Sequence, residues 1–270
     1  MNLNTIVEVK RPISLAEVGP WRAGYAWLAG GTWLFSEPQV ELDTLIDLDR
    51  LRWPPLAVMP AGLEIAATCR IADLDAFEGP AEWKAVPLFR QCCNALLASF
   101  KIWNAATVGG NLCMSLPAGA MIALTAALEG TCVLWPREGA PREVPVVDFV
   151  TGVHQNLLAP GELLRAIRLP AAALAKRSAV RQGSLVHLGR SAALLVGTRA
   201  DGGEFRLTIT ASTPRPVQLA FPRPPSAGEL AQAIDRRLSA DAYYDDVNGS
   251  APYKRHLTHY LAEQIRRELA

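Results

Sequence analysis

One stretch of the sequence decides the fold: Ile102-Trp103-Asn104-Ala105-Ala106-Thr107-Val108-Gly109-Gly110-Asn111-Leu112-Cys113. Its paired glycine is expected to form a turn between a strand-like apolar run and a helix that begins at Pro117. A second pair, Gly30-Gly31, lies in a similar apolar setting between Leu28 and Leu34. Glycine allows positive φ and close approach of a ligand, so backbone N–H groups can point at an anion. We therefore expect the two turns to converge around a group such as a diphosphate.

Short polar side chains accompany both glycine pairs. Thr32, Thr107 and Asn111 can form hydrogen bonds to phosphate or ribose without long, disordered arms. Neither turn matches the G-x-x-x-x-G-K-[ST] phosphate loop or the G-x-G-x-x-G dinucleotide turn. The sequence therefore does not favour a nucleoside triphosphatase or a Rossmann domain.

Four motifs extend this pattern along the chain: Ala29-Gly30-Gly31-Thr32, Leu45-Ile46-Asp47-Leu48, Ala105-Ala106-Thr107-Val108-Gly109-Gly110-Asn111 and Leu158-Ala159-Pro160-Gly161-Glu162-Leu163-Leu164. Their order and spacing resemble the FAD-binding medium subunit of molybdenum hydroxylases, the family of xanthine dehydrogenase and carbon monoxide dehydrogenase. The resemblance covers nearly the whole chain.

The residue pattern predicts an α/β part followed by an α+β part. Strands are expected at 5–9, 26–29, 45–48, 63–67, 131–135 and 163–169, and a strand meander over 178–199 and 204–210. Helices are expected from a capping box at Ser14, over 71–77, 83–97, 117–128 and 226–238, and from Ala251 onward. Residues 144–149 are predicted to be a connector and residues 171–175 a linker.

The resemblance implies an α+β chain with two domains. Residues 1–172 would be a FAD-binding domain of the vanillyl-alcohol-oxidase (PCMH) type, with subdomains at about 1–55 and 56–172. The prolines at 54, 55 and 60 agree with a subdomain boundary. Residues 173–270 would form a small domain with an antiparallel sheet.

Composition restricts the function further. The chain has 27 Lys and Arg against 26 Asp and Glu, a formal charge of +1, which argues against binding nucleic acid or a membrane surface through bulk charge. We find neither a membrane span nor a signal peptide and expect a cytoplasmic protein. The five cysteines have no C-x-x-C spacing and are expected to be buried hydrophobic residues. His256 and His259 are three residues apart, and we expect a solvated helix face there in place of a metal site.

The resemblance also implies the cofactor site. Backbone donors to the FAD diphosphate would come from Leu28, Ala29, Gly30, Gly31, Thr32, Trp33 and Leu34. Thr107, Gly109, Gly110 and Asn111 would line the other side of the cofactor, and Leu164 would pack near it. Ala120 and Trp103 stand where family members usually carry Asp and Arg. His187 is the titratable candidate beside the flavin ring; no residue is assigned a catalytic or metal-binding role.

Two functional hypotheses remain open. In the first, the chain is an oxidoreductase subunit whose FAD passes electrons to a final acceptor. A large subunit would carry the molybdenum cofactor and a small one the [2Fe–2S] clusters, in a heterotrimer that can dimerise. In the second, the chain is a non-catalytic scaffold of the same complex with weakened or lost FAD binding. The sequence identifies neither the substrate nor the acceptor.

Overall fold

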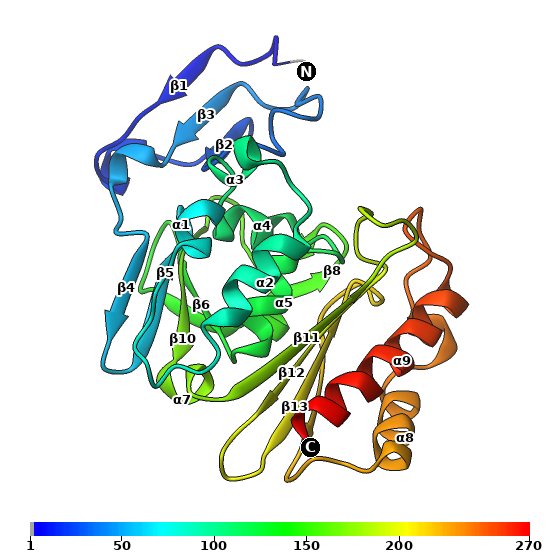
Figure 1. Cartoon of the computed structure of the whole chain (residues 1–270). Coiled ribbons are helices and arrows are strands. Elements are labelled where there is room, and N and C mark those ends of the chain that lie inside the picture. Colours follow the sequence, from blue (N-terminus) through cyan, green and yellow to red (C-terminus); the bar gives the residue numbers. More distant parts are fainter. Residues whose placement is uncertain (1–2) are drawn as a thin grey trace.

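Parallel pairing of three short strands builds the N-terminal part of the chain. β3 (Thr44–Asp47) lies between β1 (Glu8–Lys10) and β2 (Tyr25–Leu28) and runs parallel to both. The computed structural model, which describes residues 3–270, places this sheet beside α3 (Phe100–Trp103) at the top of Figure 1. The expected α/β unit is confirmed.

Two short 3₁₀ helices complete this unit: η1 (Leu15–Val18) and η2 (Asp49–Leu51). The capping box predicted at Ser14 is wrong, because the Ser14 side chain forms no capping hydrogen bond. Glu17 instead accepts from the backbone N–H of Ile13 at 2.9 Å.

A five-stranded antiparallel sheet follows. Its strands lie in the order β4 (Leu56–Met59), β5 (Gly62–Ala66), β10 (Leu163–Pro170), β6 (Thr131–Trp135) and β7 (Arg142–Pro145). A small hairpin accompanies it, formed by β8 (Val150–Gly152) and β9 (Gln155–Asn156). The helices of this part are α1 (Ile71–Asp75), α2 (Pro87–Ala95), α4 (Val108–Met114), α5 (Ala120–Ala127), α6 (Val146–Phe149) and α7 (Ala171–Leu174). The connector and the linker are therefore partly helical.

Helix α5 is the centre of the molecule. All of its residues are buried, which suits a segment that is apolar on every side. It contacts α2 and α4, and it also contacts β12 (Ala193–Arg199) and β13 (Phe205–Thr210) of the next sheet. The predicted helix at 117–128 is confirmed, but it begins at Ala120 because Gly119 is the N-cap residue.

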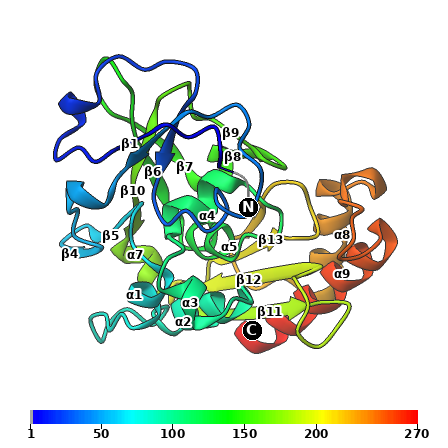
Figure 2. The same ribbon diagram turned by 90° about the horizontal axis from the view of Figure 1, so that it is seen from above.

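The C-terminal part is an antiparallel sheet of four strands, β11 (Arg177–Gly183), β12, β13 and β14 (Val217–Phe221). Helices α8 (Ala227–Arg237) and α9 (Ala251–Leu269) cover the face away from α5 (Figures 1 and 2). A short 3₁₀ helix, η3 (Ala240–Ala242), joins them. The expected α+β fold with an antiparallel C-terminal sheet is confirmed.

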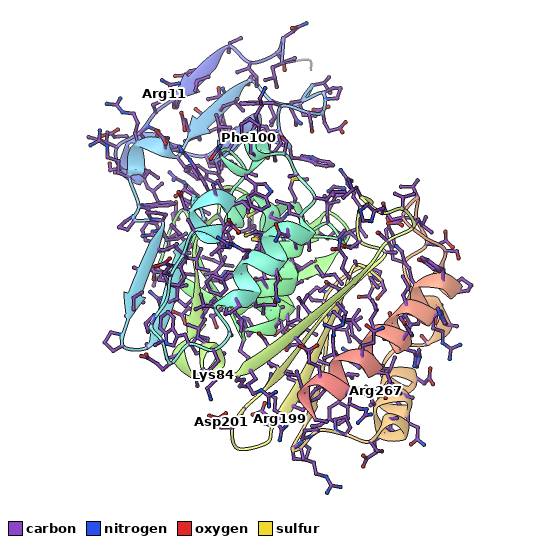
Figure 3. The ribbon with its side chains drawn as sticks, in the orientation of Figure 1. Arg11, Lys84, Phe100, Arg199, Asp201 and Arg267 are labelled. Atoms are coloured by element: carbon purple, nitrogen blue, oxygen red, sulfur yellow. The ribbon has the colours of Figure 1, made fainter. Side chains whose placement is uncertain are left out.

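Contacts join the C-terminal sheet to the rest. Lys84 pairs with Asp201 in the β12–β13 turn at 2.8 Å, at the lower edge of Figure 3. Leu194 and Val196 of β12 belong to the same buried cluster as α5. The domain division at residue 172 stays a prediction.

No helix within residues 3–270 has both the length and the apolar character needed to cross a membrane.

Gly197 on β12 offers a test of how α9 packs. A Cβ there would lie 2.2 Å from Cγ2 of Ile265. We expect Gly197→Ala to lower the free energy of unfolding by about 1–3 kcal/mol, as overpacking does. In α8, a Cβ at Gly228 would meet nothing within 4 Å, so Gly228→Ala should be neutral or stabilising. Equal denaturant midpoints for the two variants would contradict this packing.

Candidate functional site

The second glycine pair lies inside a helix. Gly109 and Gly110 belong to α4, and the preceding α3 is also helical, so the predicted strand-like run and turn are wrong. Thr107 is the N-cap residue, and its Oγ1 accepts from the N–H of Gly110 at 3.0 Å. A threonine cap can thus start a helix even where two glycines disfavour one.

Close packing explains why Gly109 is needed. A Cβ at Gly109 would lie 2.4 Å from Cβ of Ala67, the residue directly after β5. The Gly109 N–H donates to the Ala67 carbonyl at 3.0 Å, and the Val108 N–H donates to the Cys69 carbonyl at 2.9 Å. The N–H groups of this pair are therefore engaged within the protein. The pair positions α4 against the sheet.

The first glycine pair meets the 102–113 stretch directly. A Cβ at Gly30 would lie only 1.9 Å from the carbonyl oxygen of Ala105. The predicted approach of the two motifs is confirmed, although Gly109 and Gly110 are helical and the bound diphosphate stays a prediction. Gly31 adopts a φ of +68°, and its carbonyl accepts from the Phe35 N–H at 2.8 Å, closing the turn. Glycine is required at both positions, at Gly30 for space and at Gly31 for conformation.

The turn after β2 presents a run of unpaired backbone donors. In the part of the chain that the structure describes, the N–H groups of Gly30, Gly31, Thr32, Trp33 and Leu34 have no acceptor. This run follows the carboxyl end of a parallel strand, where open α/β sheets bind ligands. Successive free N–H groups of this kind bind anions.

A cavity of about 440 Å³ lies where the two motifs meet. Leu28, Ala29 and Gly30 line one side, and Asn104, Ala105 and Thr107 line another. The charged residues at its wall are Arg11, Asp47, Asp49, Arg50 and Arg70. Sequence reasoning assigned no ligand role to these charged residues or to Asn104 and Ala105.

Several residues expected near the cofactor also support the fold. Asn111 Oδ1 accepts from the N–H of Met121 at 3.1 Å and so holds the first turn of α5. Leu164 and Ala120 are 1% and 0% exposed, so both side chains pack inside the protein. The contact of Leu164 with the cofactor stays a prediction. Trp103 is half-buried, and its Nε1 has no acceptor within residues 3–270.

The motif at 158–164 is held by an ion pair. Glu162 is buried and accepts from Arg142 Nε and Nη2 at 2.7 and 2.6 Å, and from the Ala159 N–H at 3.0 Å. The hydrogen bonds from Arg142 are the main reason that the pKa of Glu162 lies below its usual range. This motif fixes the loop that leads into β10.

The predicted burial of the cysteines is confirmed for all except Cys113, which is half-buried. Burial raises the pKa of Cys69, Cys93 and Cys113 to about 12, so these thiols stay protonated. Among residues 3–270 no group of His, Cys, Asp and Glu is arranged to hold a metal ion. His187 lies in the exposed β11–β12 loop and does not line the cavity.

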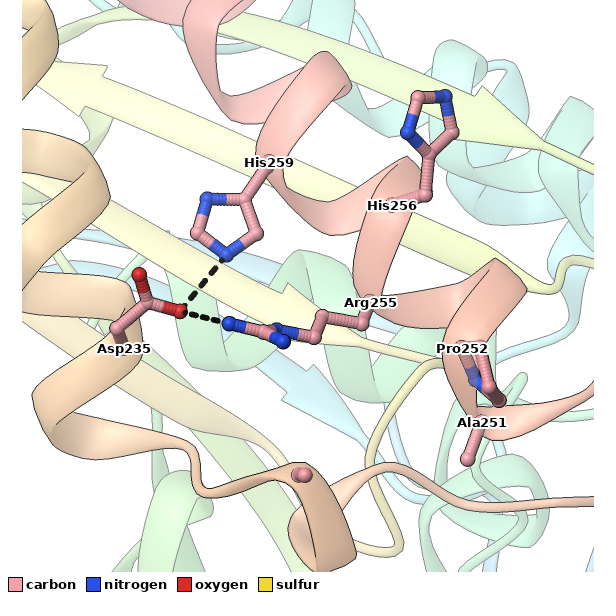
Figure 4. Close-up of a pocket in the computed structure, with 7 residues that line it drawn as sticks. Asp235, Ala251, Pro252, Arg255, His256 and His259 are labelled. Atoms are coloured by element: carbon pink, nitrogen blue, oxygen red, sulfur yellow. Dashed lines mark hydrogen bonds and ion pairs between the residues drawn. The ribbon is translucent and has the colours of Figure 1, made fainter.

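A second cavity, of about 520 Å³, lies between α8, η3 and α9. Asp235 accepts from Arg255 at 2.8 Å and lies 3.2 Å from Nε2 of His259 (Figure 4). His256 is exposed and stacks on Tyr260. The predicted solvated face is thus right for His256 and wrong for His259, which faces α8.

Residues 7–172 match the family model of the FAD binding domain in molybdopterin dehydrogenase. The chain belongs to this family. The carbon monoxide dehydrogenase medium chain of Hydrogenophaga pseudoflava is 24% identical over 271 residues, covering 90% of this chain and 87% of that one. The caffeine dehydrogenase subunit beta of Pseudomonas sp. (strain CBB1) is 29% identical over 154 residues, 54% of this chain and 50% of that one.

Solved structures share the fold. A chain of Hydrogenophaga pseudoflava carbon monoxide dehydrogenase superimposes with a TM-score of 0.81 at 23% identity, covering 98% of this chain and 97% of that one. A chain of quinoline 2-oxidoreductase from Pseudomonas putida 86 superimposes with a TM-score of 0.76 at 19% identity, covering 97% of this chain and 96% of that one.

The unpaired N–H groups of residues 30–34 fit the FAD of this family, because its diphosphate needs such donors.

Gly30→Ala tests whether the close contact with Ala105 shapes the FAD site. The new Cβ would push the loop away from the Ala105 carbonyl, and FAD affinity should fall roughly ten- to a hundredfold. Gly202→Ala is the matched control, because a Cβ there meets nothing within 4 Å. FAD retained by Gly30→Ala as tightly as by the control would show that this contact does not shape the site.

Proposed function

We propose that this chain is the flavin-carrying electron-transfer subunit of a molybdenum-containing hydroxylase or dehydrogenase. Bound FAD would supply a redox centre that exchanges electrons one at a time. The single observation that carries the proposal is the run of unpaired N–H groups from Gly30 to Leu34, beside a cavity that both motifs line. The same run favours the flavoprotein over the scaffold that has lost FAD.

The chain's own contribution is binding and orientation. The N–H groups of residues 30–34 would hold the diphosphate, and the contact between Gly30 and Ala105 would fix their direction. Gly110 and Asn111 are only partly buried, so α4 can still offer surface to the cofactor. The buried charged side chains of the described chain, Glu162, Lys176 and Lys254, each form an ion pair. We accordingly assign no side chain of this subunit to substrate chemistry.

Partner subunits would supply the other redox centres. The matched relatives are named as a medium chain of carbon monoxide dehydrogenase and a beta subunit of caffeine dehydrogenase, which supports a multi-subunit complex. A small subunit would carry the [2Fe–2S] clusters that deliver electrons and a large one the molybdenum cofactor that oxidises substrate. The buried, protonated thiols of Cys69 and Cys93 suit that division. We place the complex in the cytoplasm.

The relay predicts that substrate reduces the flavin only within the complex. The full chain would be purified alone and co-expressed with the large and small subunits. Carbon monoxide, caffeine and quinoline would be tested anaerobically, following the flavin band at ~450 nm. Bleaching is expected only for the complex, whereas dithionite should bleach both samples. Rapid bleaching of the lone chain by a substrate would contradict the relay, and a colourless complex would support the scaffold.

A further inference from the structure

Arg70 is fixed to the 102–113 stretch. Its backbone forms an isolated antiparallel bridge with Thr107, and the next residue, Ile71, donates its N–H to the Ala106 carbonyl at 3.0 Å. Arg70 also lines the cavity together with Gly30 and Thr107. A rigid part of the second subdomain therefore brings this arginine to the wall where the unpaired N–H groups begin.

Arg50 reaches the same cavity from the other subdomain. It belongs to η2, which follows β3, and the last residue of β3, Asp47, is paired in register with Leu28 of β2. The loop of unpaired donors begins two residues after Leu28. Arg50 and Arg70 thus belong to different subdomains and line one cavity.

The charges around the cavity do not balance. Arg11 pairs with Asp47 at 3.3 Å, and Asp47 also accepts from the Asp49 N–H at 3.0 Å. Within residues 3–270, the guanidinium groups of Arg50 and Arg70 have neither a hydrogen-bond partner nor an ion-pair partner. Asp49 is the remaining carboxylate at the wall, so the cavity carries net positive charge.

We infer that Arg50 and Arg70, which line the same cavity, bind the diphosphate of FAD. The inference rests on the proposed function and names further binding residues for it. Guanidinium groups match phosphate oxygens in geometry and stay charged at all physiological pH values. Gly30 lines the same cavity, so the two arginines and the run of free N–H groups that begins at Gly30 would offer the dianion donors from both subdomains.

Charge-neutral variants test the inference. FAD and riboflavin, which lacks phosphate, would be titrated into the full chain and followed by flavin fluorescence at two ionic strengths. We expect Arg70→Gln and Arg50→Gln each to weaken FAD about tenfold, leave riboflavin unchanged and flatten the salt dependence of FAD binding. Arg70→Lys should recover part of the affinity. Arg52→Gln is the matched control, because Arg52 is exposed, close in sequence and does not line the cavity.

The possible failures can be told apart. The melting temperature of each ligand-free variant should equal or exceed that of the wild type, because an unpaired charge is removed and no hydrogen bond or ion pair is lost. Unchanged FAD affinity, or an equal loss for FAD and riboflavin, would overturn the role of the arginines while leaving the flavin site in place. A wild-type chain that takes up no FAD would overturn the proposed function, and this inference with it.

Discussion

The contact between Gly30 and the Ala105 carbonyl is the constraint on which the site depends. The space between them admits no Cβ, since one would lie 1.9 Å from the oxygen. The contact holds the loop after β2 against the connection between α3 and α4. Gly109 also fixes that connection, because a Cβ there would lie 2.4 Å from Cβ of Ala67. Two glycines thus place a row of N–H groups beside a cavity, and these groups have no acceptor within the described chain.

Helix α5 carries this arrangement into the rest of the molecule. Asn111 holds the first turn of α5 by accepting from Met121, and Gln218 of β14 donates to the Ala126 carbonyl near its other end at 2.7 Å. The helix is buried between α4 on one side and the C-terminal sheet on the other. Closely packed interiors resist displacement, so the C-terminal sheet supports the position of α4. The C-terminal part does not line the cavity beside Gly30, and its role there is to support α4 through α5.

Sequence patterns predicted most elements, the approach of the two glycine motifs and the antiparallel C-terminal sheet, because periodicity and turn residues act locally. They failed where long-range packing decides. Gly109 and Gly110 form a helix because the hydrogen bond from Gly109 to the Ala67 carbonyl and the Thr107 cap compensate for poor helix propensity. Arg70 reaches the cavity through its bridge to Thr107. A local sequence pattern cannot predict this pairing, because the two residues lie far apart in the chain. The burial of Leu164 likewise follows from the arrangement of the five-stranded sheet.

Amide hydrogen exchange with and without FAD tests the central claim most directly. The account predicts that FAD at saturating concentration slows exchange of the amides from Gly30 to Leu34, which lack protein acceptors in the described chain. The amides of Gly109 and Gly110 are already hydrogen-bonded and should exchange slowly in both states. Fast exchange from Gly30 to Leu34 that FAD leaves unchanged, with FAD bound at a 1:1 ratio, would contradict the account.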